Sequence, residues 1–255
     1  MVESIEGKET LEKKPLVIGL VGCLASGKTT LSEELARRWG IEPIEENYPA
    51  NPFLEKFYKD PKEYSFKSQV FFLSSKVEQL KSIDRSKVSL IDPELNMDFI
   101  YAKTHFKMGW MNENEWNLYQ NIFFTITTKD SLVYPDMHIV VAADQEELKQ
   151  RIIDRGRNYE MGILKNYPEY LERLSESVHE WGMKGENNSY KFIANTSAGG
   201  SSGNVEQLAD RVESHICREF GTNGKFVLPK IKPALVVENY DIFPGSGGDV
   251  SRLRR

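Results

Sequence analysis

The sequence feature that most constrains the fold is a glycine-containing segment near the N-terminus, residues 22–29, with the sequence GCLASGKT. It fits the pattern G-x-x-x-x-G-K-[ST], in which glycines let backbone N–H groups point inward at a phosphate, while a lysine and a hydroxyl add a charge and an Mg²⁺ ligand. A continuous apolar run precedes it at residues 16–21, and an amphipathic segment follows at residues 30–39. These features predict a buried strand, a phosphate-binding loop and a helix whose positive end faces the phosphate.

The predicted loop holds a phosphorylated ligand, most often ATP or GTP, and by itself does not distinguish a kinase from a molecular switch. We expect Lys28 to act on the transferring phosphoryl group and the Thr29 hydroxyl to bind Mg²⁺. The nucleotide-binding residues expected in and beside the loop are Gly22, Cys23, Leu24, Ala25, Ser26, Gly27, Lys28, Thr29 and Thr30.

Strand and helix patterns alternate along the chain. Strands are predicted at residues 16–21, 41–47, 87–92, 138–143 and 190–195, and helices at 30–39, 53–59, 64–85, 98–107, 112–127, 146–153, 167–181 and 205–220. Such alternation is typical of a parallel sheet that is covered on both faces. The predicted fold is therefore α/β, a three-layer P-loop kinase-like domain with a five-stranded parallel sheet and an arginine-rich lid.

Composition limits the domain organisation and the partners. Residues 1–14 are rich in Glu and Lys and predict a disordered leader, 15–220 form the predicted domain, and 221–255 contain Gly, Ser and Pro and predict an irregular extension. The formal net charge is −5, and no apolar run reaches the length of a membrane span, so neither nucleic acid nor a membrane is expected as a partner. Cys23 and Cys217 lie far apart in sequence and predict reduced thiols in the cytoplasm.

Two acidic residues at the ends of predicted strands are candidates for a catalytic or metal-binding role. Glu46 could accept a proton from an attacking hydroxyl, although a solvated strand-end carboxylate would show the same pattern. Asp92 could support Mg²⁺ together with Thr29, and the alternative is an aspartate that caps the next turn. The histidines, at positions 105, 138, 179 and 215, have no metal-ligand spacing and are interpreted as ordinary surface or core residues.

Three arginines lie close together in the segment R-I-I-D-R-G-R. Arg151 and Arg155 are four residues apart and share a helical face, and Gly156 lets the chain turn so that Arg157 can join them. They could form a mobile clamp over transferring phosphates, with Arg151 and Arg155 in catalysis and Arg155 and Arg157 at the nucleotide. The alternative is a solvated basic helix end.

From residue 16 to residue 181 the chain resembles the deoxynucleoside kinase family. The resemblance is carried by residues 22–29, by Glu46 with the stretch NPFLEKFY at 51–58, by FKSQVFFL at 66–73 and by RIIDRGRNYE at 151–160. The NPFL stretch and the R-G-R segment look most like the bacterial deoxyadenosine and deoxyguanosine kinase branch.

The resemblance implies roles for individual residues, with ATP as phosphate donor, Mg²⁺ as cofactor and a deoxyribonucleoside as substrate. Glu46 resembles the base that takes the proton of the 5′-hydroxyl. Tyr58 and Glu160 would hold the sugar 3′-hydroxyl, and Gln69 and Asp98 would read the nucleobase. The family resemblance also implies a homodimer formed through the long helices.

Two positions depart from the family pattern. Lys76 occupies a substrate-binding position where an arginine partner is usual, which leaves the preferred nucleobase open because bidentate geometry is lost. Pro93, after Asp92, occupies the place of an arginine that the family commonly has near the 5′-hydroxyl. In the phosphate loop, Cys23 and Leu24 replace a more frequent Asn-Ile pair, but these positions act mainly through backbone donors.

The expected function is ATP-dependent phosphorylation of a deoxyribonucleoside, with a purine preferred, in nucleotide salvage. One alternative is a catalytically silent family member that serves as a structural subunit, which Pro93 and the C-terminal extension favour. Another is a nucleoside monophosphate kinase, which needs basic residues around the acceptor site. The lysines available for that role are Lys56, Lys59, Lys62, Lys67 and Lys76.

Overall fold

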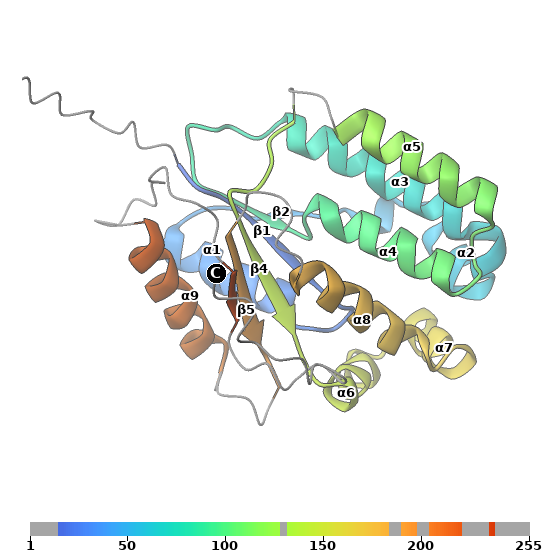
Figure 1. Cartoon of the computed structure of the whole chain (residues 1–255). Coiled ribbons are helices and arrows are strands. Elements are labelled where there is room, and N and C mark those ends of the chain that lie inside the picture. The colour runs from blue at the N-terminus through green and yellow to red at the C-terminus, as the bar shows by residue number, and fades with distance from the viewer. Residues whose placement is uncertain (1–14, 128–131, 184–189, 198–203, 221–234, 238–255) are drawn as a thin grey trace, which may run out of the picture.

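Six parallel strands form one sheet within the part of the chain that this computed structural model describes, residues 15–127, 132–183, 190–197, 204–220 and 235–237. The strands are β1 (Val17–Gly22), β2 (Ile44–Glu45), β3 (Ser89–Asp92), β4 (Met137–Ala142), β5 (Tyr190–Asn195) and β6 (Leu235–Val237). Their order is β2-β3-β1-β4-β5-β6, so that β1 lies between β3 and β4. Figure 1 shows β4 between β1 and β5. In register, Val17 pairs with Ser89 and Ile18 with Met137.

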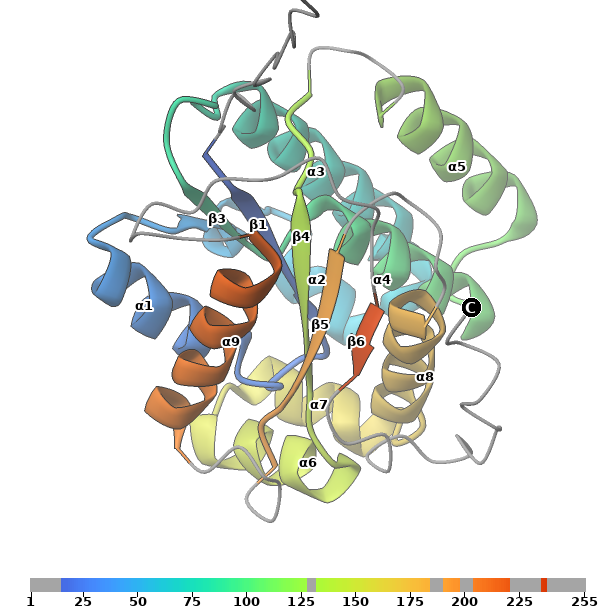
Figure 2. The ribbon, with the colours of Figure 1, turned by 60° about the vertical axis from the view of Figure 1, so that its left-hand side comes forward.

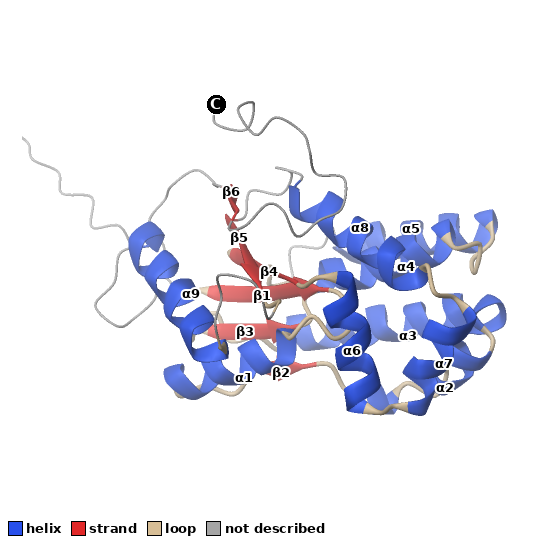
Figure 3. Cartoon of the chain, turned by 90° about the horizontal axis from the view of Figure 1, so that it is seen from below, coloured by secondary structure: helices blue, strands red, loops and turns tan. Residues whose placement is uncertain are grey.

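Helices cover both faces of this sheet. The described α-helices are α1 (Lys28–Trp39), α2 (Leu54–Lys59), α3 (Pro61–Lys81), α4 (Leu95–Lys107), α5 (Glu113–Thr127), α6 (Gln145–Arg155), α7 (Asn158–Asn166), α8 (Tyr170–Met183) and α9 (Val205–Phe220). Helices α1 and α9 lie side by side on one face (Figure 2). Helices α3, α4 and α8 lie on the other side, and α5 packs against α3 and α4 (Figure 3).

The central strand β1 explains why the domain has three layers. Its side chains alternate, so Ile18 and Leu20 join the buried cluster with α1 and α9, while Val17 and Val21 join clusters on the opposite side. All four are fully buried. A strand that buries both faces must be apolar throughout, and each such side chain contributes about 1.5–3 kcal/mol by burial.

The strand order places several strand ends together. Because β1 is flanked by β3 and β4, the sheet has its topological switch point at β1, where ligands bind beyond the carboxyl ends of parallel strands. Gly22 ends β1, Asp92 ends β3 and Glu46 directly follows β2. The phosphate loop and the two candidate acids therefore lie along one edge of the sheet.

The predicted fold class is confirmed, with differences at particular elements. All five predicted strands are present, and β6 adds a strand within the segment that was expected to be irregular. Helix α3 begins at Pro61 instead of residue 64, because Asp60 accepts a hydrogen bond from the Glu63 N–H and Pro61 suits a first helical turn. Helix α7 was not predicted, and α8 begins at Tyr170 and not at residue 167.

Some expectations cannot be compared with the structure. The leader at 1–14 and most of the extension at 221–255 lie outside the described residues. Among the residues that are described, no helix is both long enough and apolar enough to cross a bilayer.

Candidate active site

The loop between β1 and α1 has the backbone geometry of a phosphate cradle. Gly27 has φ of +93°, which favours glycine, and a Cβ at Gly22 would lie 2.4 Å from the Val141 carbonyl oxygen. The Ser26 hydroxyl is buried and has no hydrogen-bond partner in the part of the chain that the structure describes. A tight loop with an unsatisfied donor at the start of a helix fits a nucleotide phosphate.

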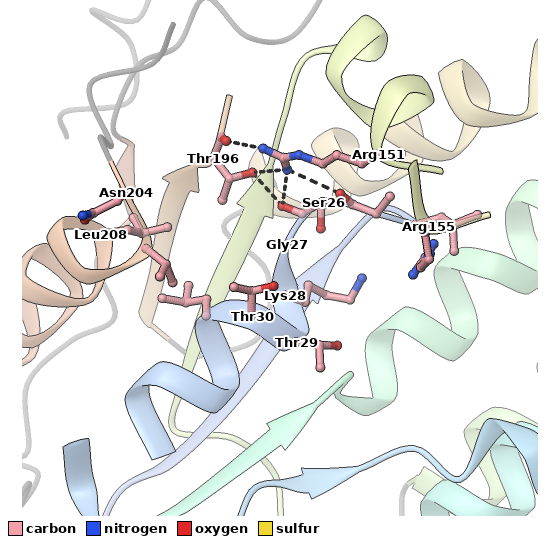
Figure 4. Close-up of a pocket in the computed structure, with 14 residues that line it drawn as sticks. Ser26, Gly27, Lys28, Thr29, Thr30, Arg151, Arg155, Thr196, Asn204 and Leu208 are labelled. Atoms are coloured by element: carbon pink, nitrogen blue, oxygen red, sulfur yellow. Dashed lines mark hydrogen bonds between the residues drawn. The ribbon is translucent and has the colours of Figure 1, made fainter. Parts of the chain in front are cut away.

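Lys28 lies at the base of the cavity beside this loop. Its ammonium donates to the Gly22 carbonyl at 2.9 Å and the Cys23 carbonyl at 2.8 Å, and burial lowers its pKa. The cavity has a volume of about 530 Å³. Figure 4 shows Arg155 on the opposite side of the loop from Asn204 and Leu208. The polar residues that line this cavity include Ser26, Lys28, Thr29, Thr30, Arg151, Arg155, Thr196 and Asn204.

Arg151 braces the phosphate loop. Its guanidinium donates to the carbonyl oxygen of Ser26 at 3.3 Å and to the Thr196 hydroxyl at 3.0 Å, and its Nε donates to Glu147 at 3.0 Å. The Thr196 hydroxyl in turn donates to the Ser26 carbonyl at 2.6 Å (Figure 4). Arg151 therefore ties the loop to the end of β5 and lines the first cavity together with Arg155, whereas Arg157 lines the second cavity.

The other two lid arginines meet at a single carboxylate. Arg155 lies 2.8 Å and Arg157 3.2 Å from Glu160, which is buried, and Arg157 also donates to the Tyr48 hydroxyl at 2.9 Å. Gly156 between them has φ of +67° and ends α6. The left-handed glycine turns the chain so that both guanidinium groups reach the same acid.

A second cavity of about 140 Å³ adjoins the first, because Leu24 lines both. Five residues predicted for the substrate come together around it from separate elements, namely Glu46, Tyr58, Gln69, Asp98 and Glu160. Lys76, also predicted there, is absent from the described lining. Its Nζ donates to the Pro93 carbonyl at 2.6 Å and lies 3.8 Å from Glu46 Oε1.

The polar groups of this cavity are desolvated and partly unsatisfied. Gln69 Oε1 and Asp98 Oδ2 are buried and have no hydrogen-bond partner among the described residues. Burial raises the pKa of Glu46, against the pull of Lys76 and Lys28, and burial raises the pKa of Asp98 well above its ordinary value. Groups that burial has left without partners are suited to a polar ligand such as a nucleobase.

Two oxygen groups could serve the predicted metal site. Asp92 is buried, its Oδ1 has no hydrogen-bond partner among the residues described, and Thr29 lines the first cavity. Hard oxygen donors suit Mg²⁺, which takes most of its other ligands from phosphate and water. The described residues contain no cluster of three or more His, Cys, Asp or Glu side chains that could hold a metal ion by themselves.

Sequence reasoning missed several residues of the site. Thr196 follows the fifth strand, and its position at a strand end was a usable signal. His105 lines the second cavity, with Nδ1 2.8 Å from the Ser65 hydroxyl and Nε2 3.1 Å from the Tyr170 hydroxyl. It lies two helical turns after Asp98, so helical periodicity could have placed both on one face.

The Cys23 thiol, 3.1 Å from the Ser175 hydroxyl, has its pKa raised to about 11 by burial and stays neutral.

A phosphate cradle that opens onto a second polar cavity, with a carboxylate beside both, defines a P-loop phosphotransferase. Residues 18–217 match the family described as deoxynucleoside kinase. The chain therefore belongs to the deoxynucleoside kinase family, whose members are kinases.

Named relatives agree with this assignment. The chain is similar to the deoxyadenosine/deoxycytidine kinase of Bacillus subtilis, with 31% identity over 67% of this chain and 79% of the relative. It is also similar to the deoxyguanosine kinase of the same organism, with 32% identity over 60% of this chain and 73% of the relative. A solved deoxyadenosine kinase of M. mycoides has the same fold, with a TM-score of 0.69, 24% identity and coverage of 80% of this chain and 99% of that one.

Proposed function

We propose that the protein transfers the γ-phosphoryl group of ATP to the 5′-hydroxyl of a deoxyribonucleoside, with a purine preferred, in cytoplasmic nucleotide salvage. The observation that carries the proposal is the position of Glu46, which lines the acceptor cavity while facing the charge of Lys28 in the phosphate loop. A base at that place can take the proton of a hydroxyl as the hydroxyl attacks the phosphoryl group.

The residues divide the reaction between donor and acceptor sides. The loop N–H groups, Lys28 and Arg155 would hold the phosphates and stabilise charge on the transferring group. Thr29 and Asp92 would hold Mg²⁺, which when bound neutralises developing phosphate charge. Tyr58 and Glu160 would fix the sugar so that its hydroxyl lies in line with the phosphorus.

The polar end of the acceptor cavity supports a purine. The Gln69 amide offers a donor and an acceptor on one side chain, which matches the N6 and N7 groups of adenine. Asp98, with its raised pKa, can carry a proton and donate to a ring nitrogen. The relatives named for deoxyadenosine and deoxyguanosine kinases are consistent with this preference, although one also carries deoxycytidine in its name.

The monophosphate kinase alternative lacks support at the acceptor cavity. The lysines Lys56, Lys59, Lys62 and Lys67 are exposed and are not part of the described lining. Lys76 is directed at Pro93 and Glu46. A phosphate on the acceptor would therefore meet few cations beyond the lid.

A panel of the four deoxynucleosides and their monophosphates, incubated with radiolabelled ATP and Mg²⁺, tests the proposal. We expect a deoxypurine nucleoside to be phosphorylated best, and Glu46→Gln to lower kcat by about 10²–10⁴-fold because the base is lost. ATP affinity of the variant should stay unchanged, since Glu46 lies outside the loop. Failure of every nucleoside to react while ATP still binds would overturn the proposal.

The homodimer belongs to the same proposal. It rests on the family resemblance and on the long helices α3, α4 and α8 at one side of the sheet. Light scattering on the purified protein measures the molar mass in solution, and a monomer at working concentrations would contradict it.

A further inference from the structure

Tyr48 lies on an anchored segment beside the acceptor cavity. It begins the short 3₁₀ helix η1 (Tyr48–Ala50), which follows β2 and has Pro49 in its first turn. The next residue, Asn51, is buried, and its side-chain amide donates to the Ser68 hydroxyl of α3 at 3.0 Å. Tyr48 therefore projects from a segment of restricted backbone freedom, and it lines the acceptor cavity.

The Tyr48 side chain makes two contacts with one arginine of the lid. The guanidinium carbon of Arg157 lies 4.9 Å from the centre of the Tyr48 ring, and Nη2 donates to the phenol oxygen at 2.9 Å. A guanidinium stacks well on an aromatic face because it is planar and weakly hydrated. The ring and the hydroxyl together restrict where this guanidinium lies.

Arg157 connects Tyr48 to a buried acid of the cavity. Its Nη1 donates to Glu160 Oε1 at 3.2 Å, while its Nη2 is the nitrogen bound to Tyr48. The Glu160 side chain is 2% exposed, so the charge-assisted hydrogen bonds that it accepts decide how its carboxylate is oriented. Tyr48, Arg157 and Glu160 thus form a chain of contacts from η1 to the wall of the acceptor cavity.

The two arginines on either side of Gly156 line different cavities. Arg155 lines the donor cavity beside the phosphate loop, whereas Arg157 lines the acceptor cavity. Gly156 has φ of +67°, and the turn that it makes separates the directions of the two side chains. This division departs from the expectation that both arginines bind the nucleotide.

The start of α7 is also held by a second aromatic contact. The ring centroids of Tyr159 and Tyr58 are 4.8 Å apart, and α7 packs beside α2 (Figure 3). Because the backbone of α7 is supported there, the contribution of Tyr48 concerns the Arg157 side chain.

We infer that Tyr48 is a positioning residue that holds the Arg157 guanidinium at the acceptor cavity, and that Arg157 in turn fixes the Glu160 carboxylate for the sugar 3′-hydroxyl. The inference rests on the proposed function, in which Glu160 binds the sugar. It adds a residue of η1 to the acceptor side, and it assigns Arg157 to the deoxyribonucleoside instead of the phosphates of ATP.

The kinetic test compares deoxyadenosine with 2′,3′-dideoxyadenosine, which lacks only the 3′-hydroxyl. In Tyr48→Leu, which removes the ring and the phenol, we expect kcat/KM for deoxyadenosine to fall about 5- to 20-fold. For dideoxyadenosine the fall should stay within about twofold, because Glu160 then has no 3′-hydroxyl to bind. Dissociation constants from calorimetry give the same comparison without turnover. An equal loss with both nucleosides would overturn the inference.

Two further tyrosine variants bracket this result. Tyr48→Phe keeps the ring and removes the hydroxyl, so its loss with deoxyadenosine should lie between that of the wild type and that of Tyr48→Leu. Tyr64→Leu is the matched control, since the Tyr64 ring also faces a cation, with Lys67 Nζ at 4.9 Å, but is absent from the described lining of both cavities. Tyr64→Leu should leave both nucleosides within about twofold of the wild type.

Arg157→Lys tests the assignment of the arginine. Lysine keeps the charge but lacks the planar fork, so this variant should lose activity with deoxyadenosine as Tyr48→Leu does. The KM for ATP should stay within about twofold of the wild type in both variants, whereas Arg155→Lys should raise it. A raised KM for ATP in Arg157→Lys, with deoxyadenosine unaffected, would assign Arg157 to the donor and overturn the inference.

A measurement on the protein alone observes the guanidinium directly. In protein labelled with ¹⁵N-arginine, with Arg157→Lys used for assignment, the Nε–H signal of Arg157 should carry a ring-current shift from Tyr48. We expect this signal to move in Tyr48→Leu and to stay in place in Tyr64→Leu. An unmoved signal in Tyr48→Leu would show that Tyr48 does not hold Arg157.

The two proposals fail in different ways. If the wild-type protein phosphorylates no nucleoside, the proposed function is wrong, and the NMR measurement still decides whether Tyr48 holds Arg157. If nucleosides react and Tyr48→Leu behaves like Tyr64→Leu, the proposed function stands and the inference about Tyr48 is wrong.

Discussion

His105 illustrates how a single buried side chain can serve both the site and the stability of the fold. Its two ring nitrogens are 2.8 Å from the Ser65 hydroxyl and 3.1 Å from the Tyr170 hydroxyl, and its ring stacks on Phe57 at 4.7 Å. Burial lowers its pKa to about 3. The imidazole is therefore neutral at physiological pH, with one nitrogen as donor and the other as acceptor.

This pKa makes the stability of the protein depend on pH with a known sign. The pKa of this histidine is 6.5 in the unfolded chain and about 3 in the folded chain. As the pH falls below 6.5, the unfolded chain therefore binds a proton at His105, whereas the folded chain does not bind it until about pH 3. Stability is therefore lost as the pH falls through that window, by about 1 kcal/mol per pH unit from this group. Urea unfolding of wild type and His105→Gln at pH 7.5 and 5.5 measures it. The variant should lose less stability between the two pH values, and equal losses would contradict the assignment.

At the residue scale, the sequence indicated which side chains lie near the cavities, but not which distant backbone groups they bond. Glu46, Gln69 and Asp98 meet in one cavity, as the resemblance implied. Arg151 instead turns to the carbonyl oxygen of Ser26, 125 positions away, and Lys76 turns to Pro93. Helical spacing gives the face on which a side chain lies, but not which distant backbone group it will meet.

At the scale of elements, burial outweighs surface charge in holding α9 to the sheet. Ile216 of α9 is fully buried in the cluster shared with α1 and β1. Across the same contact, Arg38 of α1 pairs with Asp210 and Glu213 of α9 at 2.6 and 2.9 Å. Ion pairs at a surface contribute little because solvent screens them, whereas a truncated core side chain leaves a cavity.

We expect Ile216→Ala to lower the free energy of unfolding by about 2–5 kcal/mol, measured by urea denaturation. Ser214→Ala, an exposed change on the same helix, is the control and should stay within about 0.5 kcal/mol of wild type. Arg38→Met should lower the free energy of unfolding much less than Ile216→Ala does. The reverse order of Ile216→Ala and Arg38→Met would show that charge dominates this contact.

The elements that the sequence did not reveal are those with weak patterns. The five predicted strands carry apolar runs or strand-end acids. Helix α7 buries only Glu160 and Ile163 and contains a glycine, so its apolar periodicity is too sparse to recognise. Strand β6 has three residues and gains its order from pairing with β5, a long-range contact that a local pattern cannot report.

At the scale of the whole molecule, the sheet brings donor and acceptor cavities together at its switch point. The two cavities share Leu24 of the phosphate loop, so ligands in both would lie next to each other. The site is assembled from the loop after β1, from α3 and α4, and from the lid formed by α6 and α7. Ligand binding is therefore expected to stabilise the folded domain as a unit.

A non-hydrolysable ATP analogue with Mg²⁺ should raise the Tm in thermal denaturation. At a concentration of 100 times Kd, binding to the folded state alone adds about 2.7 kcal/mol. Lys28→Met removes the ammonium from the donor cavity and should abolish most of this shift, while Lys67→Met at an exposed position of α3 should retain it. An equal shift in Lys28→Met would place the nucleotide elsewhere.

The contact of Arg155 and Arg157 with Glu160 couples the two halves of the proposed reaction. Glu160 is the acid expected to hold the sugar, and it also neutralises the lid. If a sugar hydroxyl binds Glu160 as proposed, the hydroxyl and the two guanidinium groups would bond the same carboxylate. Arg155 also lines the donor cavity, so under the proposed function we expect a bound acceptor to change the charge that the donor nucleotide meets.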